Sequence, residues 1–384
     1  MKSQILAIGI ILLVFVVLVD VYSFRGISRL ASGLTRTNNL IILSVFLITG
    51  LIATALIVWL MLKSDKFEYS KMMSYTSGLM GYMVLFYVPK LFFIFFLLIR
   101  DIALLVNRIT SSFSNPDIRA SGDLFISRAD FILQAGIIIA TIPFLSIIWG
   151  IWKGRYNYKV NNVELSFKNL PPSFEGLKII QISDLHLGSF GKDTSKLKLA
   201  IKLINKQEAD YVLFTGDIVN NLASEMEVFA AVLQEIKAKK GKFSILGNHD
   251  YGRYYRWSSK EDLNANMELL YRLHQEAGFK LLRNETAFLE SENDRIALIG
   301  VENWGIPPFP QLGDLGVAMK DVLDNDFKIL MSHDPSHWDA VVLPETDIDL
   351  TLSGHTHGMQ FAINIPGWKW SPVKLKYPRW SGLY

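Results

Sequence analysis

The chain has 384 residues, half of them hydrophobic, and a mean hydropathy of +0.26, so more than one domain is expected. Its formal net charge of +3 gives no sign of the clustered basic face that nucleic-acid-binding domains show. The chain has no cysteine, which excludes disulfides, thiolate metal sites and a cysteine nucleophile. Any metal must therefore be held by His, Asp, Glu, Asn or backbone groups.

The first 152 residues differ from the rest in their charge and in the length of their apolar stretches. They carry 12 Lys+Arg against 7 Asp+Glu, whereas the remainder carries 27 against 29. Four apolar stretches have the length of roughly 17–25 residues that a helix needs to cross a bilayer, and none shows a polar stripe. Residues 1–152 are therefore predicted to form an all-α transmembrane region with four spans, at about 5–21, 40–62, 77–99 and 131–152.

The ends and charges of these spans raise three further points. The first stretch is long for a cleaved signal peptide and three spans follow it, so an uncleaved helix is expected. Basic residues are equally numerous on both sides, which leaves the side of the C-terminal half undecided. Lys90 and Asp20 lie within apolar stretches, where a charge is costly. Packing inside the bundle is the plain interpretation, and a transport or lipid-binding role is the functional one.

After about Arg155, short apolar runs alternate with amphipathic helical stretches, which predicts an α/β domain over 153–384. The predicted strands are 163–167, 178–183, 211–215, 243–246, 295–301, 328–332 and 348–353. The predicted helices are 194–207, 224–239, 260–277 and 316–323.

Residues able to bind metal come directly after five of these strands. They are Asp184, His186, Asp217, Asn248, His249, Asp250, His333, Asp334, His355 and His357. Because ligands gather beyond the carboxyl ends of strands in α/β sheets, one shared site is expected. Five of the seven histidines lie in these loops and none in residues 1–152. Each short motif alone fits an ordinary turn or cap, so it is the ordered set that indicates a function.

In this order the motifs resemble those of the calcineurin-like metallophosphoesterase superfamily, most closely its bacterial membrane-associated branch, in which spans precede the catalytic domain. The matching text is SDLHLG at 183–188, TGDIVN at 215–220, GNHD at 247–250, SHDP at 332–335 and SGHTHG at 353–358. The resemblance covers about residues 165–384. It implies two packed, mixed β-sheets flanked by helices, with two divalent metal ions at one sheet edge.

The resemblance also implies which residues would bind the metals. Asp184, His186, Asp217 and His357 would bind one ion, and Asp217, Asn248, His333 and His355 the other, with Asp217 bridging. Two such ions would polarise a bridging water to a hydroxide that attacks phosphorus in line. Nitrogen and oxygen ligands suit Mn, Fe, Zn or Co without choosing among them. His249 would act off the metals as general acid for the leaving oxygen, and Asp250 would orient it.

The expected function is hydrolysis of phosphomono- or phosphodiesters by a multi-pass protein of the bacterial cytoplasmic membrane. A lipid-linked or envelope phosphoester is the expected substrate class, because anchoring raises the effective concentration near the bilayer. Membrane lipids are expected partners and nucleic acid is not. One alternative is a phosphodiesterase acting on a soluble nucleotide or cyclic diester. Another is a non-catalytic sensor or scaffold with an inherited metal domain, although every implied ligand is present.

Two departures from the family pattern and several further residues complete the sequence picture. Met359 stands where many relatives have glycine, and relatives continue past the equivalent of 381–384, so the second sheet is expected to lack strands. His274 is expected to have a surface or packing role. His337 and Trp338, which follow SHDP, suit either ordinary packing or the pocket lining. An aromatic run at 251–257 suits either packing or contact with a substrate or the membrane interface. The aromatic and basic tail 368–380 suits either an anionic lipid surface or unpaired segments.

Overall fold

The computed structural model describes residues 2–63, 69–112, 128–357 and 362–384. The chain divides into two compact units, Met1–Asn157 and Tyr158–Tyr384. Each unit has hydrophobic clusters of its own, one built from helices and the other from sheets and helices. Met359 lies outside the described residues.

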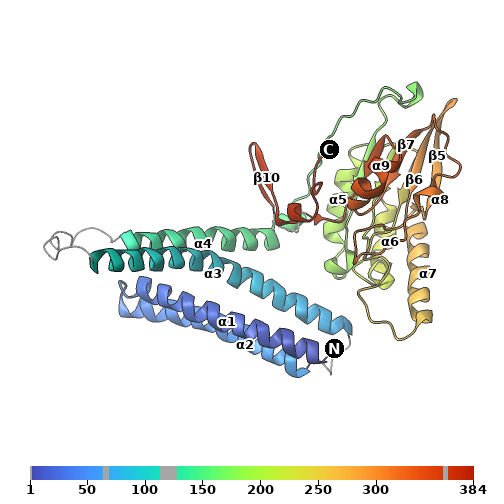
Figure 1. The fold of residues 1–384 in the computed structure, drawn as a ribbon. Helices are drawn as coiled ribbons and strands as arrows, with labels where there is room; N and C mark the ends of the chain where they lie inside the picture. The colour runs from blue at the N-terminus through green and yellow to red at the C-terminus, as the bar shows by residue number, and fades with distance from the viewer. Residues whose placement is uncertain (1, 64–68, 113–127, 358–361) are drawn as a thin grey trace. The chain divides into compact units, whose positions relative to one another are not determined.

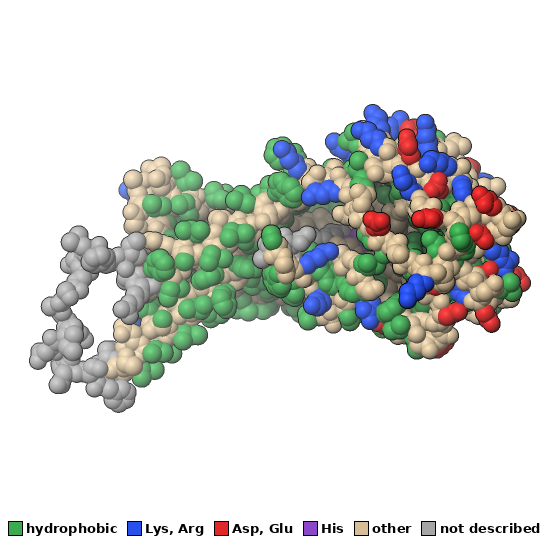
Figure 2. Space-filling view, turned by 90° about the horizontal axis from the view of Figure 1, so that it is seen from above, with side chains coloured by type: hydrophobic (Ala, Val, Ile, Leu, Met, Phe, Trp, Pro, Cys, Tyr) green, Lys and Arg blue, Asp and Glu red, His purple; other side chains and the backbone are tan. Residues whose placement is uncertain are grey.

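The first unit contains four long helices, as predicted. They are α1 (Lys2–Ala31), α2 (Arg36–Lys63), α3 (Tyr69–Ser112) and α4 (Arg128–Trp152), followed by the short turn η2 (Gly154–Tyr156). All four are long and apolar enough to cross a membrane. They extend beyond the predicted spans because polar residues continue each helix past its apolar stretch. Figure 2 shows hydrophobic side chains over the surface of this unit, as contact with lipid requires.

Within this unit, α1 and α2 lie side by side (Figure 1), and α3 completes a shared core. Asp20 and Lys90 lie inside it. The Lys90 ammonium is 2.6 Å from Asp20 Oδ1 and 3.1 Å from Thr49 Oγ1, and the Tyr87 hydroxyl donates to Asp20 Oδ2 at 3.0 Å. The packing interpretation of these two charges is therefore confirmed.

The second unit is built on two four-stranded sheets. The first, in the order β1-β2-β3-β4, is parallel throughout. The second, in the order β5-β6-β7-β8, has one antiparallel pair, β5 with β6, and parallel pairs after it. Their bounds are β1 Ile179–Ile182, β2 Tyr211–Phe214, β3 Gly241–Ser244, β4 Lys280–Leu281, β5 Glu285–Ser291, β6 Asp294–Gly300, β7 Phe327–Met331 and β8 Leu350–Leu352.

The two sheets pack face to face, with Tyr211 and Leu213 of the first in one cluster with Leu298 and Ile329 of the second. Helices cover the outer faces. The first sheet carries α5 (Ser195–Asn205), α6 (Glu227–Gln234) and α7 (Lys260–Glu276), and the second carries α8 (Leu315–Ala318), the π-helical turn η6 (Trp338–Val342) and α9 (Leu343–Glu345). The predicted fold class, four apolar helices followed by an α/β domain of two sheets flanked by helices, is thus confirmed.

The remaining elements are short. They are the turns η3 (Pro172–Phe174), η4 (Leu187–Phe190), η5 (Ala223–Glu225) and η8 (Pro372–Leu375), and the antiparallel hairpin β9 (Ile363–Ile365) and β10 (Trp368–Trp370). The turn η8 and the residues after it pack through the buried side chains of Val373, Tyr377 and Trp380.

Several predicted elements differ from the structure. Residues 163–167 form no strand, because Phe167 instead packs its ring on Phe327, 5.0 Å away. The predicted helix 224–239 is divided into η5 and α6, and the third strand begins at Gly241 instead of Phe243. Strand β5 was missed, although Ala287 and Leu289 alternate with more exposed residues as a strand facing one core requires.

Candidate metal centre

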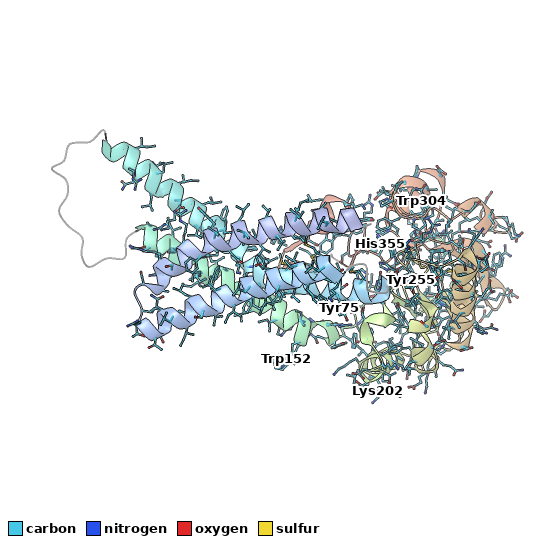
Figure 3. The ribbon with its side chains drawn as sticks, turned by 90° about the horizontal axis from the view of Figure 1, so that it is seen from below. Tyr75, Trp152, Lys202, Tyr255, Trp304 and His355 are labelled. Carbon is cyan, nitrogen blue, oxygen red and sulfur yellow. The ribbon has the colours of Figure 1, made fainter. Side chains whose placement is uncertain are left out.

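Loops at the carboxyl ends of strands from both sheets supply the predicted ligands. Asp184 and Asp217 follow β1 and β2, Asn248 follows β3, and His333 and His355 follow β7 and β8. Because the strands of each sheet that carry these loops run in parallel, their carboxyl ends open toward the same edge. Figure 3 labels His355 in this unit, together with Trp304 and Tyr255 from the loops after β6 and β3.

The backbone is strained at these loops. Eight non-glycine residues in the described parts of the chain have positive φ, and five of them are predicted ligands: Asp184, His186, Asp217, His355 and His357. Such conformations cost about 1–3 kcal/mol each and persist where the surroundings fix them, typically at functional sites. The concentration of strain on these five residues marks this edge of the fold as the site.

A first group of ligand atoms comes from Asp184, His186, Asp217 and His357, all within 4.8 Å of one another. Nε2 of His357 lies 3.1 Å from an Asp184 oxygen, and Nε2 of His186 lies 3.0 Å from Nε2 of His357. Burial lowers the pKa of His186 to about 4 in spite of the nearby Asp217 carboxylate, so its ring is neutral at pH 7, as a metal ligand must be. Asp184 has its pKa lowered, because contacts with His357 and His333 outweigh burial.

A second group shares Asp217 and adds His333 and His355. His333 is fully buried, and its Nδ1 lies 2.7 Å from the Thr215 carbonyl oxygen. A carbonyl oxygen only accepts, so Nδ1 carries the proton and Nε2 of a neutral ring is left as a lone pair. That Nε2 lies 3.2 Å from Asp217 Oδ2 and has no hydrogen-bond donor among the described residues.

Two acceptors at such a distance in a buried site need a positive charge between them. In the protein alone a proton can supply it. Burial lowers the pKa of His333, but the Asp217 and Asp184 carboxylates raise it to about 10. A divalent cation would supply more charge in the same place, with nitrogen and oxygen ligands of the right type. The residues therefore fit a metal, and their assignment as ligands stays a prediction.

His355 and Asn248, the other two residues predicted to bind the second ion, contact each other. Nδ1 of His355 lies 2.8 Å from Asn248 Oδ1, while its Nε2 lies 2.9 Å from the Tyr377 hydroxyl. Tyr377 in turn donates to the buried carboxylate of Asp334 at 3.4 Å. The hydroxyl can then accept from Nε2–H of His355. The Nδ1 lone pair in that case faces Asn248 Oδ1, a second acceptor, so this pair of atoms, like His333 Nε2 and Asp217, suits a cation between them. A histidine ligand is commonly fixed by such an outer partner.

The roles predicted for His249 and Asp250 are changed in one respect. Nδ1 of His249 lies 2.7 Å from the Asn220 carbonyl oxygen, which is the group that orients the ring. Asp250 is fully buried, and its two oxygens accept the backbone N–H groups of residues 217, 218, 219 and 247. The prediction that Asp250 orients His249 was therefore wrong. Through these hydrogen bonds, Asp250 instead links the loop that carries Asp217 to the loop that carries Asn248.

Glycine allows a close approach at two of the motifs. A β-carbon on Gly354 would collide with Ser183 Oγ and with an Asp184 oxygen, and one on Gly247 would collide with an Asp217 oxygen. These glycines therefore let neighbouring loops bring the carboxylates together, which explains their places within the SGHTHG and GNHD motifs.

The sequence did not indicate Tyr377 as part of the site, and it left the aromatic run that contains Tyr254 open between packing and contact with a substrate or the membrane interface. Tyr254 accepts a hydrogen bond from Asn248 Nδ2 at 3.0 Å, and its ring centroid lies 4.7 Å from that of His249. The aromatic run thus packs around the site. His274 is buried, so of the surface and packing roles left open it has the packing role. His337 is also buried, stacks on Trp304 at 5.0 Å and is not among the described residues that line the cavity.

Each of the two units is similar to a known protein domain. The family model described as "Probable Calcineurin-like phosphoesterase, transmembrane domain" matches residues 4–155, and that described as "Calcineurin-like phosphoesterase" matches residues 177–359. The structure agrees with these matches, because four apolar helices come first in the chain and two sheets with His, Asp and Asn at their strand ends follow. The chain thus carries a calcineurin-like phosphoesterase domain at residues 177–359 and, at residues 4–155, the transmembrane domain that is described with such phosphoesterases. It is a multi-pass membrane protein.

Three relatives show how far the similarity extends. A "Transmembrane protein with metallophosphoesterase domain" from Bos taurus is 28% identical over 277 residues, which are 69% of this chain and 58% of that protein. The metallophosphoesterase YkuE of Bacillus subtilis (strain 168) is 31% identical over 203 residues, 52% of this chain and 64% of YkuE. A metallophosphoesterase of Aquifex aeolicus (strain VF5) is 27% identical over 222 residues, 56% of this chain and 76% of its own. The chain spans little more than half of the Bos taurus protein.

Proposed function

We propose that the protein is a metal-dependent phosphoesterase that hydrolyses phosphomono- or phosphodiesters at this site. The observation that carries the proposal is the pair of ligand groups joined by Asp217. Because one carboxylate is shared, two cations can be held close together, as the two-metal hydrolases require. Mn, Fe, Zn and Co all suit the ligands.

The chain's own residues would supply the proton transfer and hold the loops that carry the ligands. When bound, two divalent cations supply an activated water as nucleophile and neutralise charge on the phosphoryl oxygens. His249 lines the cavity beside the ligands, and Asn220 fixes its Nδ1–H, so Nε2 is the nitrogen free to exchange a proton with the leaving oxygen. The buried carboxylate of Asp250 holds the loops of Asp217 and Asn248 in register.

The membrane unit supports a substrate that is lipid-linked or part of the envelope, because tethering concentrates the site near the bilayer. A soluble nucleotide diester is the alternative substrate, and a panel of esters separates the two. The non-catalytic sensor is disfavoured because every implied ligand and His249 line or approach one cavity.

The test uses the full chain purified in detergent. Metal content is measured by mass spectrometry, and Mn-dependent hydrolysis of bis-p-nitrophenyl phosphate is measured beside it, for the wild type and Asp217→Asn. Two metals per chain and activity that falls at least about 100-fold in the variant support the proposal. Metal without turnover favours the sensor, and no bound metal refutes the metal-dependent mechanism.

A further inference from the structure

A cavity of about 440 Å³ opens beside the ligands and has two unlike walls. One wall consists of the metal-site residues Asp217, Asn248, His249, His355 and His357. The second wall adjoins it at His355 and comes from Phe309 and from the tail segment 372–377, through Pro372, Val373, Lys376 and Tyr377. A phosphoryl group drawn to the first wall would therefore extend the rest of its ester toward the second.

The tail segment is held firmly enough to serve as a wall. Tyr377 contacts His355 through its hydroxyl, and the Trp380 carbonyl accepts a hydrogen bond from Thr356 Oγ1 at 2.7 Å. The side chains of Val373, Tyr377 and Trp380 are 5%, 6% and 7% exposed. Lys376 is an exposed residue directly before Tyr377, the buried residue that touches a predicted ligand.

Lys376 brings a positive charge to a wall that is otherwise largely apolar. Its ammonium lies 4.8 Å from the centroid of the Phe309 ring, a distance at which a cation is attracted to the ring face. Among the described residues that line the cavity it is the one Lys or Arg, and no described carboxylate pairs with it. Lys376 is exposed, so its ammonium is open to an anion that enters the cavity from solvent, and its contact with the Phe309 ring places the charge at the cavity wall.

The metal-site wall already accounts for the phosphoryl group. We propose that Lys376 is a specificity-determining residue that binds a second anionic group on the substrate. This group is carried by an organic substituent of the phosphorus, either the leaving alcohol or, in a diester, the alcohol that stays attached. This proposal rests on the proposed function. The substrate class is then a phosphoester with a further carboxylate, phosphate or sulfate, and neutral esters are poorer substrates.

Lys374 provides a matched control. It lies two residues earlier, within η8, and is exposed as Lys376 is, but it is not among the described residues lining the cavity. Replacing either lysine by methionine removes one charge from the same segment and keeps a long side chain. A difference between the two variants therefore reports the position of the charge and not the net charge of the tail.

The test compares two phosphonates that differ by one carboxylate, propylphosphonate and 3-phosphonopropionate. Their binding to Mn-loaded full chain is measured by calorimetry, and their inhibition of bis-p-nitrophenyl phosphate hydrolysis is measured in parallel. The wild type and Lys374→Met are expected to bind 3-phosphonopropionate about tenfold more tightly, or about 1.4 kcal/mol. Lys376→Met loses this preference, and Lys376→Arg retains most of it.

The calorimetric result stands apart from catalysis. If turnover is absent but the preference exists and depends on Lys376, the proposed function fails and the anion site is supported. If the wild type shows no preference, or Lys376→Met keeps it, the role of Lys376 is refuted, even if the ester is hydrolysed. An equal loss in Lys374→Met and Lys376→Met also refutes it, because the effect is then one of overall charge.

Discussion

The hydroxyl of Tyr377 lies 2.9 Å from Nε2 of His355, so a residue of the C-terminal tail directly contacts a predicted metal ligand. Burial and the Asp334 carboxylate raise the pKa of Tyr377, which keeps the hydroxyl protonated at neutral pH. It can therefore donate to Asp334 while accepting from His355. This relay fixes which nitrogen of His355 faces the site.

Tyr377→Phe is expected to lower metal affinity or activity about tenfold, because the outer partner of a ligand is lost while the ring remains. Metal titration of the full chain in detergent, monitored by Mn-dependent activity, measures both effects. Tyr384→Phe is the control, since that ring is 59% exposed. Unchanged affinity and activity in Tyr377→Phe would show that His355 needs no such support.

His249→Gln is expected to separate turnover from metal binding. If His249 transfers a proton to the leaving oxygen, kcat falls about 10²–10⁴-fold while two metals remain bound. The loss should be smaller for esters whose leaving group is already acidic, such as p-nitrophenol. Metal analysis and kcat for a p-nitrophenyl and an alkyl ester provide the comparison. Loss of metal with normal kcat per loaded site would contradict the assignment.

Sequence patterns identified the candidate ligands but not the residues that orient them. The ligand candidates could be found because short strands end in polar residues, and the structure brings Asp184, Asp217 and His333 within a few ångströms. Their partners could not be found in this way. Tyr377 reaches His355 from 22 residues away, and Asn220 contributes a backbone carbonyl, which no residue type reveals.

The errors in the fold have local causes. Residues 163–167 alternate in hydrophobicity as a strand does, yet Phe167 is used for packing on Phe327 and no neighbouring strand pairs with the segment in the described structure. Asp250 was assigned to its neighbour in sequence, His249. Its carboxylate in fact satisfies four buried backbone N–H groups, a requirement that appears only once the loops meet.

The ion pair inside the helical unit gives a prediction for the membrane region. Lys90→Met leaves the Asp20 carboxylate without its cation among apolar helices and is expected to destabilise the bundle by about 3–5 kcal/mol. The double variant Asp20→Asn, Lys90→Met should recover much of this, because no unpaired charge remains. Unfolding in mixed detergent micelles measures both, with Lys63→Met at the exposed end of α2 as control. A double variant no more stable than Lys90→Met would argue that the pair has another role.

His274 predicts how the stability of the α/β unit depends on pH. The ring is fully buried on α7, with Nδ1 3.0 Å from Ser244 Oγ, and burial lowers its pKa from 6.5 to about 4. Above pH 6.5 the ring is neutral in both the folded and the unfolded chain, so it adds no pH dependence. Between pH 6.5 and 4 the unfolded chain takes up a proton that the folded chain does not, and stability falls as the pH falls.

The linked loss in the free energy of unfolding approaches about 3 kcal/mol by pH 4. His274→Asn keeps a polar atom near Ser244 but cannot take up the proton. We therefore expect it to be less stable than the wild type at pH 7.5 and to lose less stability on acidification. Urea unfolding of the full chain in detergent at pH 7.5, 6, 5 and 4.5, followed by near-UV circular dichroism, gives both curves. Parallel curves would show that other groups cause the acid sensitivity, whereas convergence toward pH 4.5 assigns it to this buried ring.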